Sequence, residues 1–278
     1  MPRTTIRGFF MKEETQTAMM RKGNPGKRVA LIVISIIIAV LFWYFFSKLL
    51  DLPAFILPGP NLVWQRFLQS LQDGQIITHL FATLLEVLVG LLLGGITATI
   101  LGYLLSKSTT LEKIISPYLV ASQSIPIVAI APLIVIWFGP GIFSKILICS
   151  LTVFFPILIN TVVGLREVPQ DLRDLMRSLN ATKTQTFIKL EIPAALPIFF
   201  GGLRVGATLS VIGAVVGELV GSDRGLGFLI NVGRGQYDTA LVFVSVITLI
   251  LLAMSLYGLV LLLENRFLAW QTWRQEKA

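Results

Sequence analysis

Few side chains in this sequence are suited to covalent chemistry. The chain of 278 residues contains one histidine, His79, and one cysteine, Cys149. It contains neither the HExxH pattern of zinc hydrolases nor the GxxxxGK[ST] loop that cradles nucleotide phosphates. Metal sites, Ser–His hydrolase sites and disulfide frameworks need more of these residues than the chain holds. We therefore expect no catalytic, cofactor-binding or metal-binding residue, and no enzymatic activity.

Two acidic residues, Glu86 and Glu218, lie inside long apolar stretches. An ionisable side chain at membrane depth costs at least about 2.5 kcal/mol unless it faces protein or water, which makes such residues candidates for a solute path. Glu218 also lies close to Ser222 and Asp223 in the sequence, and a location at the membrane interface would explain it equally well. Both interpretations stay open.

Three prolines interrupt the apolar stretch 117–138, and Pro156 lies in the next one. Each proline removes a helical hydrogen bond, so we expect both helices to bend or break. In a membrane, broken helices are tolerated where they line protein or a water-filled cavity; a kink used only for packing is the alternative. The residues beside the central proline are therefore candidates to line a translocation path: Gln123, Ser124 and Pro126.

The segment 166–197 carries the most informative pattern among the polar connections. Pro169 is suited to the start of a helix. The apolar residues after it follow helical spacing on one face: Leu172, Leu175, Met176 and Leu179. Asn180 tolerates the left-handed conformation that ends a helix. The pattern predicts a short amphipathic helix that stops at Asn180.

A second short helix is predicted directly after it. It can start at Thr182 or Thr184 as N-cap, and it is expected to run through Phe187 and to stop at Pro193. The product is a helix–turn–helix knob. Such a knob can lie on its own membrane or dock into a groove on a partner protein, and the residues alone leave both possibilities open.

The composition shows what kind of element must carry these residues. Hydrophobic residues make up 55% of the chain and charged residues 14%, against roughly 25% charged in soluble domains. Runs of about 20 apolar residues can cross a hydrocarbon core about 30 Å thick, and they are too long for barrel strands. We predict an all-α polytopic membrane protein with six transmembrane helices, at Val29–Leu50, Leu80–Leu105, Ile114–Phe138, Ile146–Leu165, Leu196–Val220 and Ala240–Leu263.

Lysine and arginine are distributed unevenly around these six helices. Most fall in the two termini and in the connections after the second and fourth helices, which the positive-inside rule places in the cytoplasm. The net charge of +8 is therefore a topology signal, and nucleic-acid binding is the weaker explanation. We expect a multi-pass protein of the bacterial inner membrane with both termini cytoplasmic. The first helix is expected to be a retained anchor, because it exceeds the apolar length of a cleaved signal.

Glycines recur at four-residue spacing in two of the predicted helices. Gly90 and Gly94 form one pair and Gly202 and Gly206 another, and such pairs allow helices to approach closely in a membrane. The glycine-rich stretch 221–235 lacks the strand–turn–helix context of a nucleotide-binding fingerprint. We expect it to be a plain loop on the outer side.

The segment 166–197 resembles the cytoplasmic motif of permeases from binding-protein-dependent ABC importers. That motif reads Glu-Ala-Ala, three residues, Gly, nine residues, Ile-x-Leu-Pro, and the spacing here is the same throughout. Asp-Leu-Met at 174–176 stands where the family has Glu-Ala-Ala, Asn180 stands for Gly, and Leu-Glu-Ile-Pro at 190–193 stands for Ile-x-Leu-Pro. Asp keeps the acid and Asn keeps the turn, while the larger side chains at 175 and 176 change the packing.

The resemblance implies that the knob is a coupling helix that inserts into an ATPase subunit. ATP and Mg²⁺ would then be bound by the partner ATPase. The other implied partners are a second permease copy, expected to be identical, a periplasmic or lipoprotein solute-binding protein, and membrane lipid, with no nucleic acid. The residues that the motif assigns to ATPase coupling are Asp174, Leu175, Met176, Leu179, Asn180, Ala181, Phe187 and Pro193.

Three further stretches resemble the nitrate/taurine/sulfonate-type branch of this family. They are LPGPNLVWQ at 57–65, SQSIPIVAIAPLIVIWFG at 122–139 and GAVVGELVGSDRGLGFLI at 213–230. Within the branch they are most similar to permeases for thiamine-pyrimidine precursors or riboflavin. The resemblance implies a permease subunit that translocates a small solute, and in such systems a separate external protein selects that solute.

An ion-gradient-driven secondary transporter is the alternative function. Its usual marks are internal repeats and ionisable pairs at the midplane, and neither is evident in the sequence. The family resemblance covers roughly 83–264. It sets the expected organisation as a cytoplasmic tail, a first helix with an external amphipathic segment, a permease core domain and a second cytoplasmic tail, at 1–28, 29–79, 80–264 and 265–278.

Overall fold

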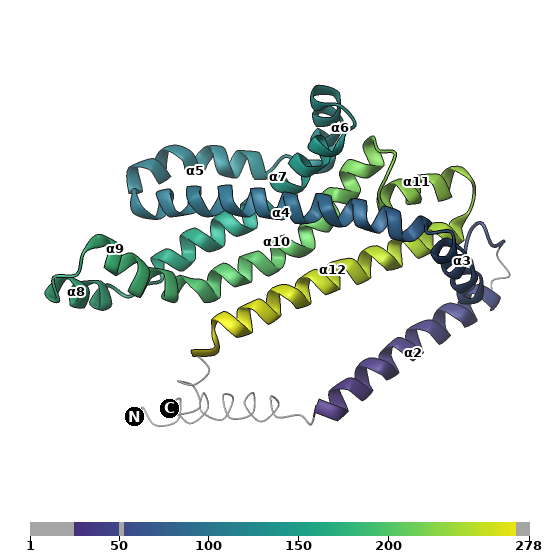
Figure 1. Cartoon of the computed structure of the whole chain (residues 1–278), viewed down its shortest axis with the longest axis horizontal. Coiled ribbons are helices and arrows are strands. Elements are labelled where there is room, and N and C mark those ends of the chain that lie inside the picture. Colours follow the sequence, from purple (N-terminus) through teal and green to yellow (C-terminus); the bar gives the residue numbers. More distant parts are fainter. Residues whose placement is uncertain (1–24, 50–52, 271–278) are drawn as a thin grey trace, which may run out of the picture. The chain divides into compact units, whose positions relative to one another are not determined.

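The computed structural model describes residues 25–49 and 53–270, and the regular structure in these two ranges is helical (Figure 1). Most of the predicted N-terminal tail, up to residue 24, lies outside the described residues. The same holds for the predicted C-terminal tail from residue 271 onward. The all-α prediction is confirmed within the described ranges.

The chain divides into two units, 1–62 and 63–278, with the division inside helix α3 (Pro60–Gln72). The first unit contains α2 (Pro25–Leu49), which covers most of the first predicted span. Its large apolar side chains are exposed, as a lipid-facing helix requires, and the rings of Phe42 and Phe46 stack with centroids 5.8 Å apart.

The second unit holds the remaining helices. Four described stretches, or five if a bent pair counts as one span, are long and apolar enough to cross a membrane. The apolar stretch of α2 that is described, Val33–Leu49, is shorter than these, so the count of six stays a prediction. The elements of this unit are α4 (Gln75–Lys107), α5 (Thr109–Gln123), α6 (Ile127–Phe138), α7 (Ile142–Arg166), α8 (Gln170–Ser178), α9 (Lys183–Thr186), a π-helical turn (Phe187–Glu191), α10 (Ile192–Val220), α11 (Leu226–Gly235) and α12 (Thr239–Phe267).

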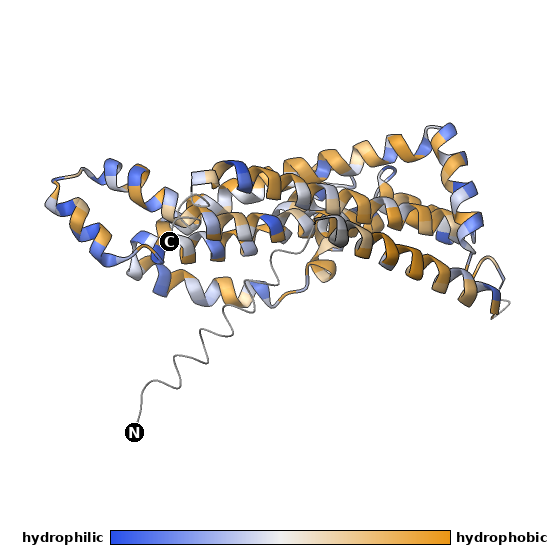
Figure 2. Ribbon diagram, turned by 90° about the horizontal axis from the view of Figure 1, so that it is seen from below, coloured by the Kyte–Doolittle hydropathy of each residue, from blue (hydrophilic) through white to orange (hydrophobic). Residues whose placement is uncertain are grey.

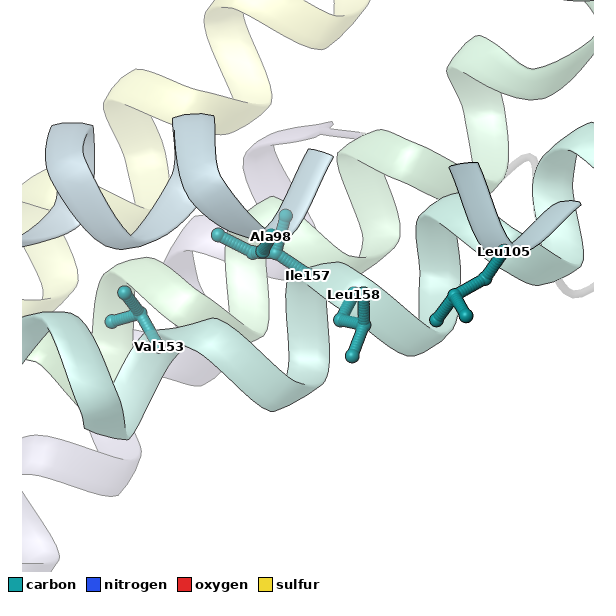
Figure 3. Close-up of a cluster of buried hydrophobic side chains, with 5 residues drawn as sticks. All are labelled: Ala98, Leu105, Val153, Ile157 and Leu158. Carbon is teal, nitrogen blue, oxygen red and sulfur yellow. The ribbon is translucent and has the colours of Figure 1, made fainter. Parts of the chain in front are cut away.

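Helix α7 is the centre of the second unit, with α4 along one side and α10 along another. Figure 3 shows one of the clusters that hold α4 and α7 together. Its side chains are buried and aliphatic, so dispersion contacts rather than polar groups join these helices. The cluster consists of Ala98 and Leu105 from α4 and of Val153, Ile157 and Leu158 from α7.

Glycines bring the backbones of these helices close together. A Cβ atom at Gly90 would overlap Cys149 of α7, and one at Gly94 would lie 2.5 Å from the Ser150 carbonyl oxygen. On α10, a Cβ at Gly202 would lie 2.6 Å from the Cβ of Asn160. The close approach predicted from the glycine spacing is confirmed at these contacts.

The third predicted span is broken as the prolines suggested. Helices α5 and α6 meet at an angle of 94°. The break lies between Gln123, where α5 ends, and Ile127, where α6 begins, and Pro126 is the N-cap of α6. Pro156, by contrast, lies inside an unbroken α7, so this span does not break there, and the expected bend stays a prediction. Packing of α4 and α10 along α7 holds the helix together across the one missing hydrogen bond.

Hydropathy separates the long helices from the two ends of the second unit. In Figure 2 the long helices are mostly hydrophobic, and hydrophilic residues occur at the end that carries α8 and α9 and also at the opposite end. In Figure 1, α11 lies at the opposite end of the same unit. The second unit therefore has one end formed by α8 and α9 and an opposite end at α11, and α4, α7 and α10 join the two.

A prediction follows from the glycine contacts. Replacing Gly90 by Ala inserts a methyl group into the α4–α7 contact, and overpacking of this kind costs about 1–3 kcal/mol. Thermal unfolding of the detergent-solubilised protein should therefore shift to lower temperature. The control is Gly258→Ala on α12, because no atom lies within 4 Å of the added Cβ. Equal thermal-unfolding midpoints for the two variants would contradict the close packing of α4 on α7.

Candidate functional site

The turn between α8 and α9 is closed by Asn180. Its φ is +51°, the left-handed conformation expected from the sequence. Ala181 donates its N–H to the Met176 carbonyl at 3.0 Å, and Asn180 donates to the Arg177 carbonyl at 2.9 Å. This pair of bonds is the Schellman arrangement, which satisfies the carbonyls at a helix end. The predicted helix end at Asn180 is confirmed.

Helix α8 keeps its apolar residues uncovered. Leu172, Leu175 and Leu179 are 42%, 54% and 67% exposed, although they share the stripe predicted from the sequence. Asp174 is also exposed and bonds Arg177 and Gln170 of the same helix at 3.2 Å each. An amphipathic helix normally buries its apolar face. Within the described chain, nothing covers this one.

The second helix of the segment begins as predicted but does not end as predicted. Thr182 caps α9 with a complete capping box, in which its hydroxyl and the Gln185 side chain each accept a backbone N–H. The expected stop at Pro193 is wrong, because α9 continues through the π-helical turn into α10 and Pro193 lies in the first turn of α10. A π turn widens the coil and leaves room for the proline ring. Phe187 of this turn packs edge-on against Tyr103, with centroids 4.9 Å apart.

A cavity of about 410 Å³ lies at the break between α5 and α6. Gln123 and Pro126, two of the candidate path residues, line it together with Leu151, Thr152 and Phe155 of α7. Ser124 lies beside the cavity, and its hydroxyl donates to the Val120 carbonyl at 3.1 Å. The backbone break and the cavity therefore occur at the same place, as expected where irregular backbone lines a path.

The other two candidate path residues, Glu86 and Glu218, belong to a buried polar cluster away from the break. They are 2% and 0% exposed. Lys145 of α7 lies between α4 and α10, with its Nζ 3.5 Å from Glu86 Oε1 and donating to Ser222 Oγ. Thr83 donates to Glu218 Oε1 at 2.6 Å. Buried charges need partners of this kind, and here three helices supply them.

This cluster also caps helix α11. The first backbone N–H groups of α11 have no partner within the helix. Gly225 N donates to His79 Nδ1 at 3.0 Å, Leu226 N to Thr83 Oγ1 at 2.8 Å, and Gly227 N to Glu218 Oε2. A carboxylate at a helix N-terminus is also favoured by the helix dipole. The expectation of a plain loop over 221–235 is wrong, because these side chains from distant segments stabilise a helix there.

Two buried charged residues were not singled out from the sequence. Lys145 was placed in a connection, yet it lies in the first turn of α7 and is 3% exposed. A lysine next to an apolar stretch, with two unpaired acids in other stretches, is the signal that could have found it. Glu191, in the variable position of the Ile-x-Leu-Pro motif, is also 3% exposed, and nothing in the motif distinguishes it.

Comparison with known proteins matches these features to one family. Residues 87–269 match the family described as "Binding-protein-dependent transport system inner membrane component". The chain belongs to this family. The matched range includes α8, α9, the break between α5 and α6, and α11. The chain is thus the transmembrane permease subunit of an ABC importer, and it is not an enzyme.

Curated relatives carry the same assignment. The chain is 46% identical to the "Riboflavin transport system permease protein RibX" of Chloroflexus aurantiacus over 86% of this chain and 89% of the relative. It is 36% identical to the "Formylaminopyrimidine transport permease protein ThiX" of Halalkalibacterium halodurans, over 84% and 92%. With the "Putative aliphatic sulfonates transport permease protein SsuC" of Bacillus subtilis the identity is 32%, over 93% and 94%. The resemblance to this branch is confirmed.

Two solved structures share the fold. A chain of the MetNI methionine ABC transporter in inward-facing conformations aligns with a TM-score of 0.55 at 20% identity, over 67% of this permease and 93% of that chain. A chain of an amino acid ABC transporter crystallised with histidines aligns with a TM-score of 0.52 at 19% identity, over 72% and 98%. The alternative of an ion-gradient-driven carrier does not fit this family.

The cap on α11 leads to a prediction. Glu218→Ala removes the acceptor for Gly227 N and for the Thr83 hydroxyl, and breaking a buried ionic network costs about 3–5 kcal/mol. The amides of α11 should then exchange with deuterium much faster in the solubilised permease. Asp223→Asn is the control, because the Asp223 side chain is 84% exposed. Unchanged exchange over α11 in Glu218→Ala would refute the capping role.

Proposed function

We propose that α8 and the following turn are the surface onto which an ATPase subunit docks. The observation that carries the proposal is the exposed apolar stripe of Leu172, Leu175 and Leu179 on a helix that stands outside the long apolar spans. A stripe of this kind suits a groove on a partner protein. The family to which the permease belongs takes part in transport systems in which ATP is hydrolysed by a separate subunit.

The charges around this stripe favour a protein partner over the membrane surface. Helices that lie on a membrane carry Lys and Arg on the polar face. Here the polar face carries Asp171 and Asp174 as well as Arg177. A face of mixed sign gains little from anionic lipid, whereas it can pair with complementary charges in a groove.

We propose further that the solute passes at the break between α5 and α6. The cavity there has polar groups from Ser122, Gln123 and Thr152 and the aromatic ring of Phe155. Large apolar side chains on the outer faces of α5 and α6 are exposed, among them Tyr118 and Ile136 at 74% each. A second, identical permease copy is the partner proposed to cover this side, and lipid the proposed surroundings of the remaining apolar faces.

The proposed solute is an uncharged heterocycle of the riboflavin or thiamine-pyrimidine type, delivered by an external binding protein. None of the described residues that line the cavity is charged, and a sulfonate anion crossing it would lose its hydration without a cation in return. The relatives named for riboflavin and for a formylaminopyrimidine support the same class. The permease is proposed to lie in a bacterial inner membrane with both termini cytoplasmic.

Docking at α8 can be tested by one substitution. Leu175→Glu puts a charge into the apolar stripe, so copurification of the ATPase subunit with the permease should be lost, and ATP-driven uptake with it. The control is Lys113→Glu, which places the same residue at an exposed position on another helix, α5. Full copurification with Leu175→Glu would contradict docking at this stripe.

The path can be tested by filling the cavity. Ile130→Trp narrows it, so uptake of labelled riboflavin into vesicles that hold permease, ATPase and binding protein should be largely lost, because the larger side chain takes space that the solute needs. Leu251→Trp on α12 is the control, because that side chain is 60% exposed and lies outside the α5 and α6 faces proposed to meet the second copy. Equal uptake by both variants would refute the path, and uptake of taurine in preference to riboflavin would refute the solute class.

A further inference from the structure

Glu191 is a buried acidic residue in the π-helical turn that joins α9 to α10. Its side chain is 4% exposed, while those of its two cationic partners are 39% and 29% exposed. Lys107, the last residue of α4, donates to both Glu191 carboxylate oxygens at 2.6 Å. Arg173 of α8 lies 3.5 Å from Glu191 Oε1. A single carboxylate therefore connects α8, α4 and the start of α10.

Arg173 ties α8 to the rest of the permease at a second point. One guanidinium nitrogen faces Glu191, and the other donates to the Leu165 carbonyl near the end of α7 at 2.8 Å. Helix α8 carries two arginines, Arg173 and Arg177. The described side-chain bond of Arg177 is to Asp174 of its own helix. Among the described contacts, Arg173 is thus the polar side-chain link from α8 to the long helices.

The second ionic contact at this end has a different connectivity. Arg166 of α7 bonds both oxygens of Glu112 at 2.6 Å, and it also donates to the Leu105 carbonyl of α4 at 3.1 Å. This contact joins α4, α5 and α7 and includes no residue of α8. It provides a matched comparison, because it is an Arg–Glu pair at the same end without a connection to the docking helix.

Helix α4 links this end to the far end of the second unit. It is 33 residues long, and it carries Lys107 at its last position and Thr83 and Glu86 near its first turns. The latter two belong to the cluster that caps α11. Because α4 also packs tightly on α7 through glycine contacts, a displacement applied at Lys107 moves the whole helix rather than a flexible segment.

We propose that Glu191 is a positioning residue which transmits the displacement of α8 to α4, through Arg173 on one side and Lys107 on the other. Backbone continuity through the π turn already connects α8 to α10. The Glu191 contacts add a second route, so that α4 and α10 move together when α8 moves. The inference rests on the proposed docking of the ATPase at α8.

The test uses the complete transporter in vesicles and measures three quantities: ATPase subunit bound, ATP hydrolysed and riboflavin taken up. Arg173→Gln is the main variant, because Glu191 keeps Lys107 as a partner and the buried carboxylate stays paired. We expect normal ATPase binding, continued hydrolysis and uptake per ATP reduced by roughly fivefold or more, the range of allosteric couplings. Arg173→Lys keeps the charge and should restore most of the ratio, and Glu112→Gln should leave it unchanged.

A double variant separates transmission from plain stabilisation. If Arg173 and Glu191 act through one contact, Arg173→Gln combined with Glu191→Gln lowers uptake per ATP no further than Glu191→Gln alone. Independent, multiplying losses would overturn the proposal, as would an unchanged ratio in Arg173→Gln. Loss of ATPase binding in Arg173→Gln would overturn it too, since Arg173 would then belong to the docking surface. Failure of the unaltered permease to bind the ATPase would instead refute the docking at α8.

Discussion

The close packing of α7 between α4 and α10 is the constraint on which the other features depend. Glycine contacts such as Gly90 with Cys149 and Gly202 with Asn160 leave no room for a methyl group. In a hydrocarbon solvent apolar burial adds little, so close dispersion contacts of this kind hold helices together. The three packed helices reach from the end at α8 to the cap on α11. These three helices therefore form one continuous packed unit between the two ends.

A second constraint in the membrane is that the polar groups inside this packed unit need partners. Lys145 pairs with Glu86, and Glu218 takes the N–H of Gly227 and the hydroxyl of Thr83, so that each charge has partners from another helix. Such buried networks contribute more to a unique arrangement than to stability, because removing a charge from water is costly. In this permease the arrangement that they specify is the position of α11.

Two apolar surfaces of the described chain are left uncovered, and their surroundings differ. The stripe on α8 lies among acidic and basic side chains outside the apolar spans, which suits a protein groove. The outer faces of α5 and α6 lie within a span, beside the cavity at the break. Both fit the transmembrane permease subunit of an ABC importer, which works only as part of an assembly. The Glu191 contacts connect the first of these surfaces to α4 and to the start of α10.

Hydrophobic run length determined most of the fold, because helix length in a membrane is set by the thickness of the hydrocarbon. Local rules also predicted the helix end at Asn180 and the break before α6, since backbone preferences at Asn and Pro depend on few neighbours. The tertiary structure alone decided which residues meet. Pro156 and Pro193 lie in continuous helices, and the glycine-rich stretch 221–235 forms α11. Glu191 and Lys145 became recognisable only through partners many positions away, because contacts between distant segments leave no periodic trace in the sequence.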